Sequence, residues 1–91
     1  MQRPWRVTAA KLVTHGVLHV EFADGVSGLL DMRPLLSRAV NMLVPLTDPA
    51  VFAQFRVNEG NLDTVTWPNG YDICPETMHR AIRGAGKLIL G

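Results

Sequence analysis

Aspartates, histidines and a single cysteine are the side chains of this sequence that could do chemistry. A cluster of carboxylates could bind a metal ion or transfer protons, and the aspartates are Asp24, Asp31, Asp48, Asp63 and Asp72. Asp24 stands in an Asp-Gly turn, while Asp31 and Asp48 each precede a proline-containing helix start, where aspartate caps backbone N–H groups. Asp72 lies between a turn and a helix and could hold N–H groups in the same way. Structural roles are therefore favoured over an acidic site.

The histidines lack the spacing of metal ligands, since His15, His19 and His79 include no pair one helical turn apart. Cys74 is the only cysteine, which excludes an internal disulfide and a multi-cysteine metal cluster. A place before a helix could lower the pKa of its thiol. Without a neighbouring base, however, a small apolar plug or weak helix cap is the favoured interpretation. No catalytic triad order, phosphate loop or nucleotide fingerprint is present. We therefore expect no enzyme, no cofactor and no metal.

The composition is that of one small globular domain, with 91 residues, of which 47% are hydrophobic and 19% charged. A domain of this size has a thin margin of stability unless it pairs with something. A net charge of +1 predicts neither a strong field for nucleic acid nor adhesion to an acidic membrane. No apolar stretch reaches the length of a membrane span or of a signal peptide. The expectation is a cytoplasmic protein with no membrane contact.

Alternating apolar residues predict an antiparallel meander at the start of the chain, with strands at 6–14, 17–22 and 26–31. In the second strand Leu18, Val20 and Phe22 share one face, because side chains alternate with a period of two. A second hairpin is predicted later in the chain, with strands at 55–59 and 62–67 and a turn at Gly60-Asn61. In its returning strand Val65 and Trp67 face the core, and Thr64 and Thr66 face away.

Three short helices are predicted, one around Pro34, one from Pro49 to about Phe55 and one from Pro75 to Arg83. The connection at 38–46 contains Pro45 and is expected to lack regular structure. The order of elements predicts an α+β fold, a small antiparallel β-meander and a second β-hairpin with short helices packed on one face. Residues 1–83 are expected to form one domain, and residues 84–91 an apolar C-terminal tail. The residues that define this architecture are Asp24, Gly25, Asp48, Pro49, Trp67, Pro68, Asn69, Gly70, Asp72 and Pro75.

Several of these segments resemble the small bacterial domain of unknown function 2442 family. They are the hairpin at 22–26, the segment 31–36, the turn at 45–49 with Phe52, and Trp67-Pro68-Asn69-Gly70 with the following Asp72 and Pro75-Glu76. The resemblance covers residues 7 to 78, and the chain departs from the pattern at His79. It implies a compact α+β domain, found alone or joined to a helix-turn-helix. It also implies a frequent neighbour gene for another small protein, which suggests a toxin–antitoxin-like pair. No catalytic residues follow from it.

Three functions remain open. The favoured one is a protein-interaction module that binds a small partner protein or another copy of itself through a strand edge and the apolar tail. A nucleic-acid-linked transcriptional regulator that uses a basic strip is the alternative, and it is not favoured because no reading helix can be drawn. A small-molecule site around Trp67 and Tyr71 is a weaker option. The candidate partner-contact residues are Arg80, Arg83, Lys87, Leu88, Ile89 and Leu90.

Overall fold

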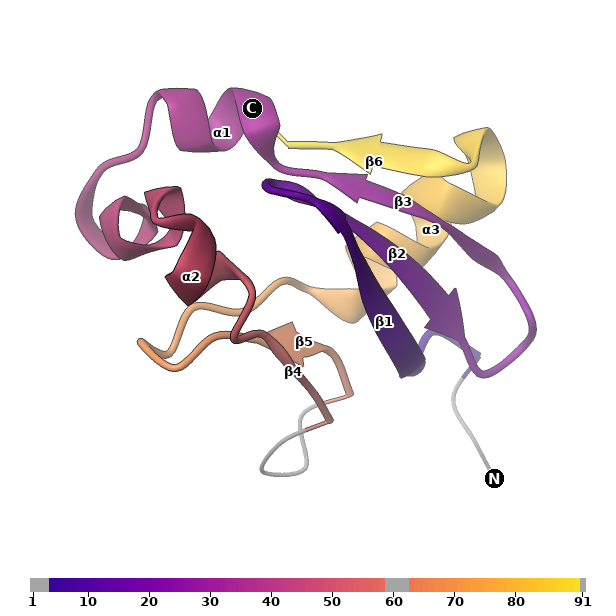
Figure 1. Cartoon of the computed structure of the whole chain (residues 1–91). Helices are drawn as coiled ribbons and strands as arrows, with labels where there is room; N and C mark the ends of the chain where they lie inside the picture. The colour runs from indigo at the N-terminus through magenta and orange to yellow at the C-terminus, as the bar shows by residue number, and fades with distance from the viewer. Residues whose placement is uncertain (1–3, 59–62, 91) are drawn as a thin grey trace.

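The computed structural model of the chain describes residues 4–58 and 63–90. Its strands are β1 Val7–Thr14, β2 Val17–Phe22, β3 Ser27–Asp31, β4 Arg56–Val57, β5 Val65–Thr66 and β6 Lys87–Ile89. Its helices are α1 Arg33–Ser37, the 3-10 helix η1 Asn41–Thr47, α2 Pro49–Phe52 and α3 Pro75–Ala85. A four-stranded sheet has the order β1-β2-β3-β6, and a smaller sheet pairs β4 with β5 (Figure 1). The predicted α+β class is confirmed.

The predicted meander is confirmed, since β1 pairs with β2 and β2 with β3, both antiparallel. Leu18, Val20 and Phe22 of β2 are buried because the period of the strand turns all three to the same face. The turn before β3 is held by Asp24, whose Oδ1 accepts a hydrogen bond of 3.1 Å from the Val26 amide. This local pairing needs no distant partner, which explains why the sequence pattern reveals it.

Helix α3 covers one face of the larger sheet and leaves most of the opposite face open (Figure 1). Met78 is fully buried and Ile82 is 2% exposed, so the apolar stripe of the helix lies against the sheet. The helix ends at Gly86, whose φ of +76° is the left-handed conformation that glycine adopts most readily. Gly86 therefore turns the chain directly from α3 into β6.

The C-terminal segment is not a free tail, and this corrects the expectation for residues 84–91. Lys87–Ile89 form β6, which pairs with β3 in parallel, with Leu88 opposite Leu30. Gly28 of β3 permits this pairing, because a Cβ at that position would lie 2.2 Å from the Gly86 carbonyl oxygen. The partner surface for the apolar run is thus the chain's own sheet. A parallel pair between strands nearly sixty positions apart leaves no local signal in the sequence.

The second hairpin is shorter than predicted, with two paired residues in each of β4 and β5. The expected turn at Gly60-Asn61 lies outside the described residues. Trp67 is 3% exposed and Val65 fully buried, as the pattern predicts. Thr64 and Thr66, however, are also buried, which is a correction. Thr64 can be buried because its hydroxyl donates a 2.6 Å hydrogen bond to the Ile73 carbonyl.

The connection at 38–46 is more regular than predicted, since most of it belongs to η1. A 3-10 helix of this kind needs no amphipathic period, so the sequence pattern gave no sign of it. Helix α2 is shorter than predicted and ends at Phe52 rather than near Phe55. Asp48 is its N-cap and accepts a 2.9 Å hydrogen bond from the Ala50 amide. These short helices fill the end of the molecule beside α1 (Figure 1).

Candidate interaction surface at the β6 edge

Strand β6 forms one edge of the larger sheet, and the segment predicted to contact a partner is therefore ordered along that edge (Figure 1). Leu88 and Leu90 are partly buried and pack against the core. Ile89 remains 52% exposed. The apolar run is thus divided between the core and the surface.

The backbone of β6 faces two ways. Toward β3, the Gly86 carbonyl accepts a hydrogen bond of 3.1 Å from the Leu29 amide, and the Leu90 amide donates one of 2.8 Å to the Asp31 carbonyl. Because successive residues of a strand point their backbone groups to opposite sides, the N–H and C=O groups of Lys87 and Ile89 face away from β3. The edge therefore offers two donors and two acceptors to another strand.

The side chains beside these backbone groups lie on the open face of the sheet. Lys87 is paired with Leu29, and Ile89 with Asp31, so all four side chains share one face. Leu29 is 39% exposed and Ile89 52% exposed, which makes a small apolar area next to the edge. The Arg33 guanidinium hydrogen-bonds to Asp31 and lowers the pKa of that carboxyl, and Lys87 adds to the effect.

The remaining predicted contact residues, Arg80 and Arg83, are exposed on α3. Neither makes an ion pair within the described part of the chain. Arg83 lies in the last turn of the helix, where its charge suits the helix dipole. Since only four positions separate Arg83 from Lys87, positive charge gathers where α3 passes into β6.

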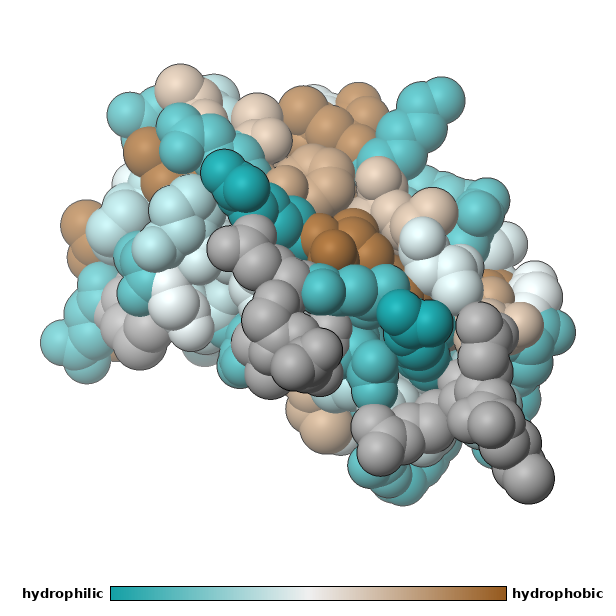
Figure 2. Space-filling model, turned by 90° about the horizontal axis from the view of Figure 1, so that it is seen from below, coloured by the Kyte–Doolittle hydropathy of each residue, from teal (hydrophilic) through white to brown (hydrophobic). Residues whose placement is uncertain are grey.

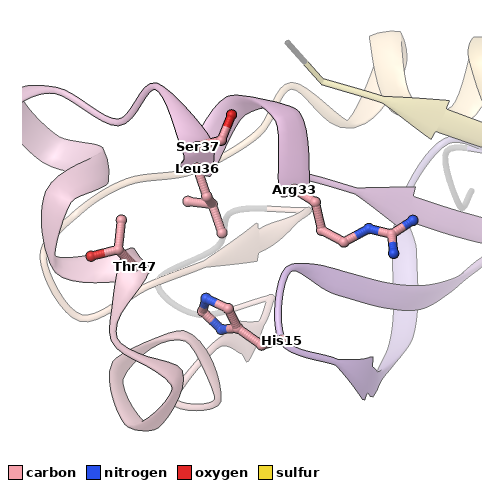
Figure 3. A pocket seen from close by; sticks show the side chains of 5 residues that line it. All are labelled: His15, Arg33, Leu36, Ser37 and Thr47. Carbon is pink, nitrogen blue, oxygen red and sulfur yellow. The ribbon is translucent and has the colours of Figure 1, made fainter.

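A cavity of about 300 Å³ opens at the other end of the sheet, and it is lined by His15, Arg33, Leu36, Ser37 and Thr47 (Figure 3). The His15 ring and the Leu36 side chain point toward each other, and the Arg33 guanidinium points away. That guanidinium is held by Asp31 with contacts of 3.0 and 2.7 Å. The arginine charge is therefore already neutralised.

The two hydroxyl groups of this cavity are also engaged. The Ser37 hydroxyl donates to the Pro34 carbonyl, and the Thr47 hydroxyl donates to the Val44 carbonyl. The His15 ring packs against Phe52, and its Nδ1 is buried without a partner among the described residues. Because the His15 Nδ1 atom has almost no exposed area, a ligand in the cavity could not contact it. The cavity thus presents mainly apolar atoms, which give a ligand little orientation.

Trp67 and Tyr71 do not form the exposed pair that a small-molecule site would use. The Trp67 indole nitrogen donates a 2.9 Å hydrogen bond to the Phe52 carbonyl inside the core. Tyr71 packs beside it with ring centroids 5.9 Å apart, and burial raises the pKa of its hydroxyl. The Pro68-Asn69-Gly70 turn between them is closed by two backbone hydrogen bonds: the Trp67 amide donates to the Tyr71 carbonyl, and the Gly70 amide donates to the Trp67 carbonyl. Gly70 has a φ of +92°.

Among the titratable residues singled out from the sequence, His79 and Asp24 come together. His79 Nε2 lies 2.9 Å from Asp24 Oδ2, and the imidazole packs edge-on against Phe22. The hydrogen bond from His79 lowers the pKa of Asp24. The contact joins the turn before β3 to helix α3, which is a structural role. Across residues 4–58 and 63–90, no three His, Cys, Asp or Glu side chains gather in a way that could hold a metal ion.

Cys74 is exposed, so its interpretation as a small apolar plug is wrong. It does occupy the N-cap position of α3, without a side-chain hydrogen bond that caps the helix. The amide and hydroxyl groups of Thr77 nevertheless lower the pKa of the thiol, because they favour the thiolate at the start of the helix. Asp72 is exposed as well, and its segment is joined to Thr66 by one backbone bridge. Neither residue belongs to a cluster that suggests chemistry.

The family model described as protein of unknown function, DUF2442, matches residues 7–84 of the 91-residue chain. The chain therefore belongs to this family. The match extends past Met78 through most of α3, and β6 lies beyond it. Neither curated proteins nor solved structures give a significant match. None of the helices in the described residues is both long and apolar enough to span a lipid bilayer.

Proposed function

We propose that this member of the DUF2442 family is a non-catalytic protein-interaction module of the bacterial cytoplasm, one half of a toxin–antitoxin-like or regulatory pair. It binds a small partner protein by accepting a strand at the β6 edge. The observation that carries the proposal is the pair of outward-facing backbone positions, Lys87 and Ile89, beside the exposed side chains of Leu29 and Ile89.

Strand addition is the mode that this geometry favours. Main-chain hydrogen bonds supply affinity, and side chains on alternating positions supply specificity. At β6 both contributions are present, since Lys87 and Ile89 direct backbone groups outward and side chains onto one face. A small domain with a thin stability margin also gains from the area that a partner covers.

The two alternative functions have weaker support. Arg80, Arg83 and Lys87 could contact phosphates, but the net charge of +1 provides little long-range attraction. A ligand site at Trp67 would have to replace the hydrogen bond that its indole already makes to the Phe52 carbonyl.

The proposal is tested by removing a single outward N–H group. Proline at Ile89 lacks the N–H that would bind a partner, whereas the β3-facing bonds of Gly86 and Leu90 remain. We expect Ile89→Pro to fold but to lose co-purification with the protein encoded by the neighbouring gene. The matched control is Ile89→Val, which keeps the N–H group and a β-branched side chain and should still bind.

The same purified proteins also distinguish strand addition from DNA binding. Binding at the strand edge depends weakly on salt because it rests on backbone and apolar contacts, whereas binding to duplex DNA falls steeply with salt. A folded Ile89→Pro variant that retains its partner as well as the control would overturn the proposal. Salt-sensitive DNA binding without a protein partner would do so as well, in favour of the regulator.

A further inference from the structure

The charges around the β6 edge have the same sign as those that a second copy would bring to it. Arg80, Arg83 and Lys87 are cationic and exposed, and the acid nearest to Ile89 in the sheet, Asp31, is already bound by Arg33. The edge is therefore locally positive, although the whole chain carries a net charge of only +1. A local field of this kind selects partners of opposite charge.

Self-pairing of β6 opposes these charges. If two copies paired antiparallel about Leu88, Lys87 of each copy would lie opposite Ile89 of the other. The two lysines would then be diagonal neighbours, about 7–8 Å apart, and like charges at that spacing are unfavourable. A second copy is thus the weaker occupant.

We propose that the occupant of the β6 edge is an extended acidic segment of the partner protein. This inference rests on the proposed function and names the chemistry of its partner. Lys87 and Ile89 share one face and are two positions apart. An added strand therefore presents one residue to each, an acidic one opposite Lys87 and an apolar, preferably β-branched, one opposite Ile89. Antiparallel addition gives the order apolar, any residue, acidic.

Arg83 extends this preference beyond the first pair. It lies in the last turn of α3, just before Gly86 turns the chain into β6. An acidic residue further along the added strand therefore meets a second positive charge. Since both cations are exposed, each contributes modestly, and they act on partner choice and association rate more than on total affinity.

The test uses two short blocked peptides that differ in one charge. One has the sequence Thr-Val-Thr-Glu-Thr and the other Thr-Val-Thr-Lys-Thr, and binding is followed by the NMR shifts of the Lys87 and Ile89 amides. At low ionic strength the glutamate peptide should bind roughly threefold to tenfold more tightly, and added salt should reduce this difference. The charge-reversed variant Lys87→Glu should prefer the lysine peptide. Ile89→Pro should bind neither.

The outcomes separate the inference from the proposed function. If both peptides bind equally well and Ile89→Pro abolishes both, the edge accepts a strand but the acidic preference is refuted. If the peptides bind without shifting the two amides, or bind Ile89→Pro unchanged, strand addition at β6 is refuted as well. Absence of binding by either peptide also counts against both. Concentration-dependent self-association lost in Ile89→Pro would assign the edge to a second copy.

Discussion

The two edges of the four-stranded sheet, β1 and β6, are protected in different ways. Strand β1 has eight residues, and its register with β2 is interrupted twice, between Val7 and Ala9 and between Leu12 and Thr14. Its start is also covered, since the Val7 amide donates to the Asp63 carbonyl at 3.1 Å. Strand β6 is short and regular and carries a lysine, and none of the other strands in the described residues pairs with its outer side. Irregular register, cover, short length and lysine are all known means to prevent edge-to-edge association.

This difference between β1 and β6 indicates which edge of the sheet could still accept a strand from a specific partner. Irregular pairing and cover exclude every strand, whereas Lys87 excludes a cationic strand and admits an acidic one. Exposed hydrophobic residues do occur on β1, where Leu12 is 40% and Val13 55% exposed. Seen from below, the molecule has hydrophobic side chains gathered in the middle of its surface between hydrophilic ones (Figure 2). Because the register of β1 is interrupted, its exposed hydrophobic residues are not accompanied by a regular row of backbone groups, and β1 is therefore a poorer template for an added strand.

The largest effect is expected where β6 joins the sheet. In Gly28→Ala the new Cβ would lie 2.2 Å from the Gly86 oxygen and 2.7 Å from Ile82 Cγ2, so α3 and β6 must shift. We expect a loss of about 2 kcal/mol or more in unfolding free energy, measured by urea denaturation. The control is Gly84→Ala in α3, where no atom lies within 4 Å of the new Cβ.

Gly84→Ala should stabilise the protein by about 0.5–1 kcal/mol, because alanine loses less conformational entropy in a helix. Equal stability of the Gly28 variant and the native chain would show that β6 is not held against β3 as described. The β1 edge should be unaffected in either variant, and amide exchange of Ala10 and Leu12 would report this.

Turn and cap residues such as Asp48 were predictable because their chemistry is local, and so was the alternation of Leu18, Val20 and Phe22. The place of β6 was not predictable, since its parallel pairing with β3 depends on a glycine nearly sixty positions away. The burial of Thr64 was not predicted from the alternating pattern, because a hydroxyl that has a hydrogen-bond partner can be buried like an apolar group. The sequence predicted which residues belong to the candidate site but not how they are arranged, because no sequence pattern shows which backbone groups stay unpaired.

A smaller effect is expected on the β1 side of the comparison. The turn at Gly70 holds β5 and its neighbours, which adjoin Asp63 and so support the cover over the start of β1. Gly70 has a φ of +92°, and a β-branched residue is strained there. Gly70→Val should lower the unfolding free energy by about 1 kcal/mol or more, and Gly70→Asn by less, because asparagine tolerates the left-handed region. Thermal melts of equal midpoint for the three proteins would contradict this strain.

The smallest effect concerns the contact between His79 and Asp24, which joins α3 to the turn between β2 and β3. The hydrogen bond from His79 and that from the Val26 amide lower the pKa of Asp24 from its usual 3.8. A carboxyl whose pKa is lower in the folded state stabilises the fold above its unfolded pKa, and this contribution is lost as the pH falls through the folded pKa. The midpoint difference between the native chain and Asp24→Asn should therefore be largest above about pH 4 and shrink in stronger acid. Asparagine can still accept the Val26 bond, so the comparison isolates the contact with His79. A midpoint difference that stays constant throughout the acid range would show that the carboxylate charge does not fasten α3 to the sheet.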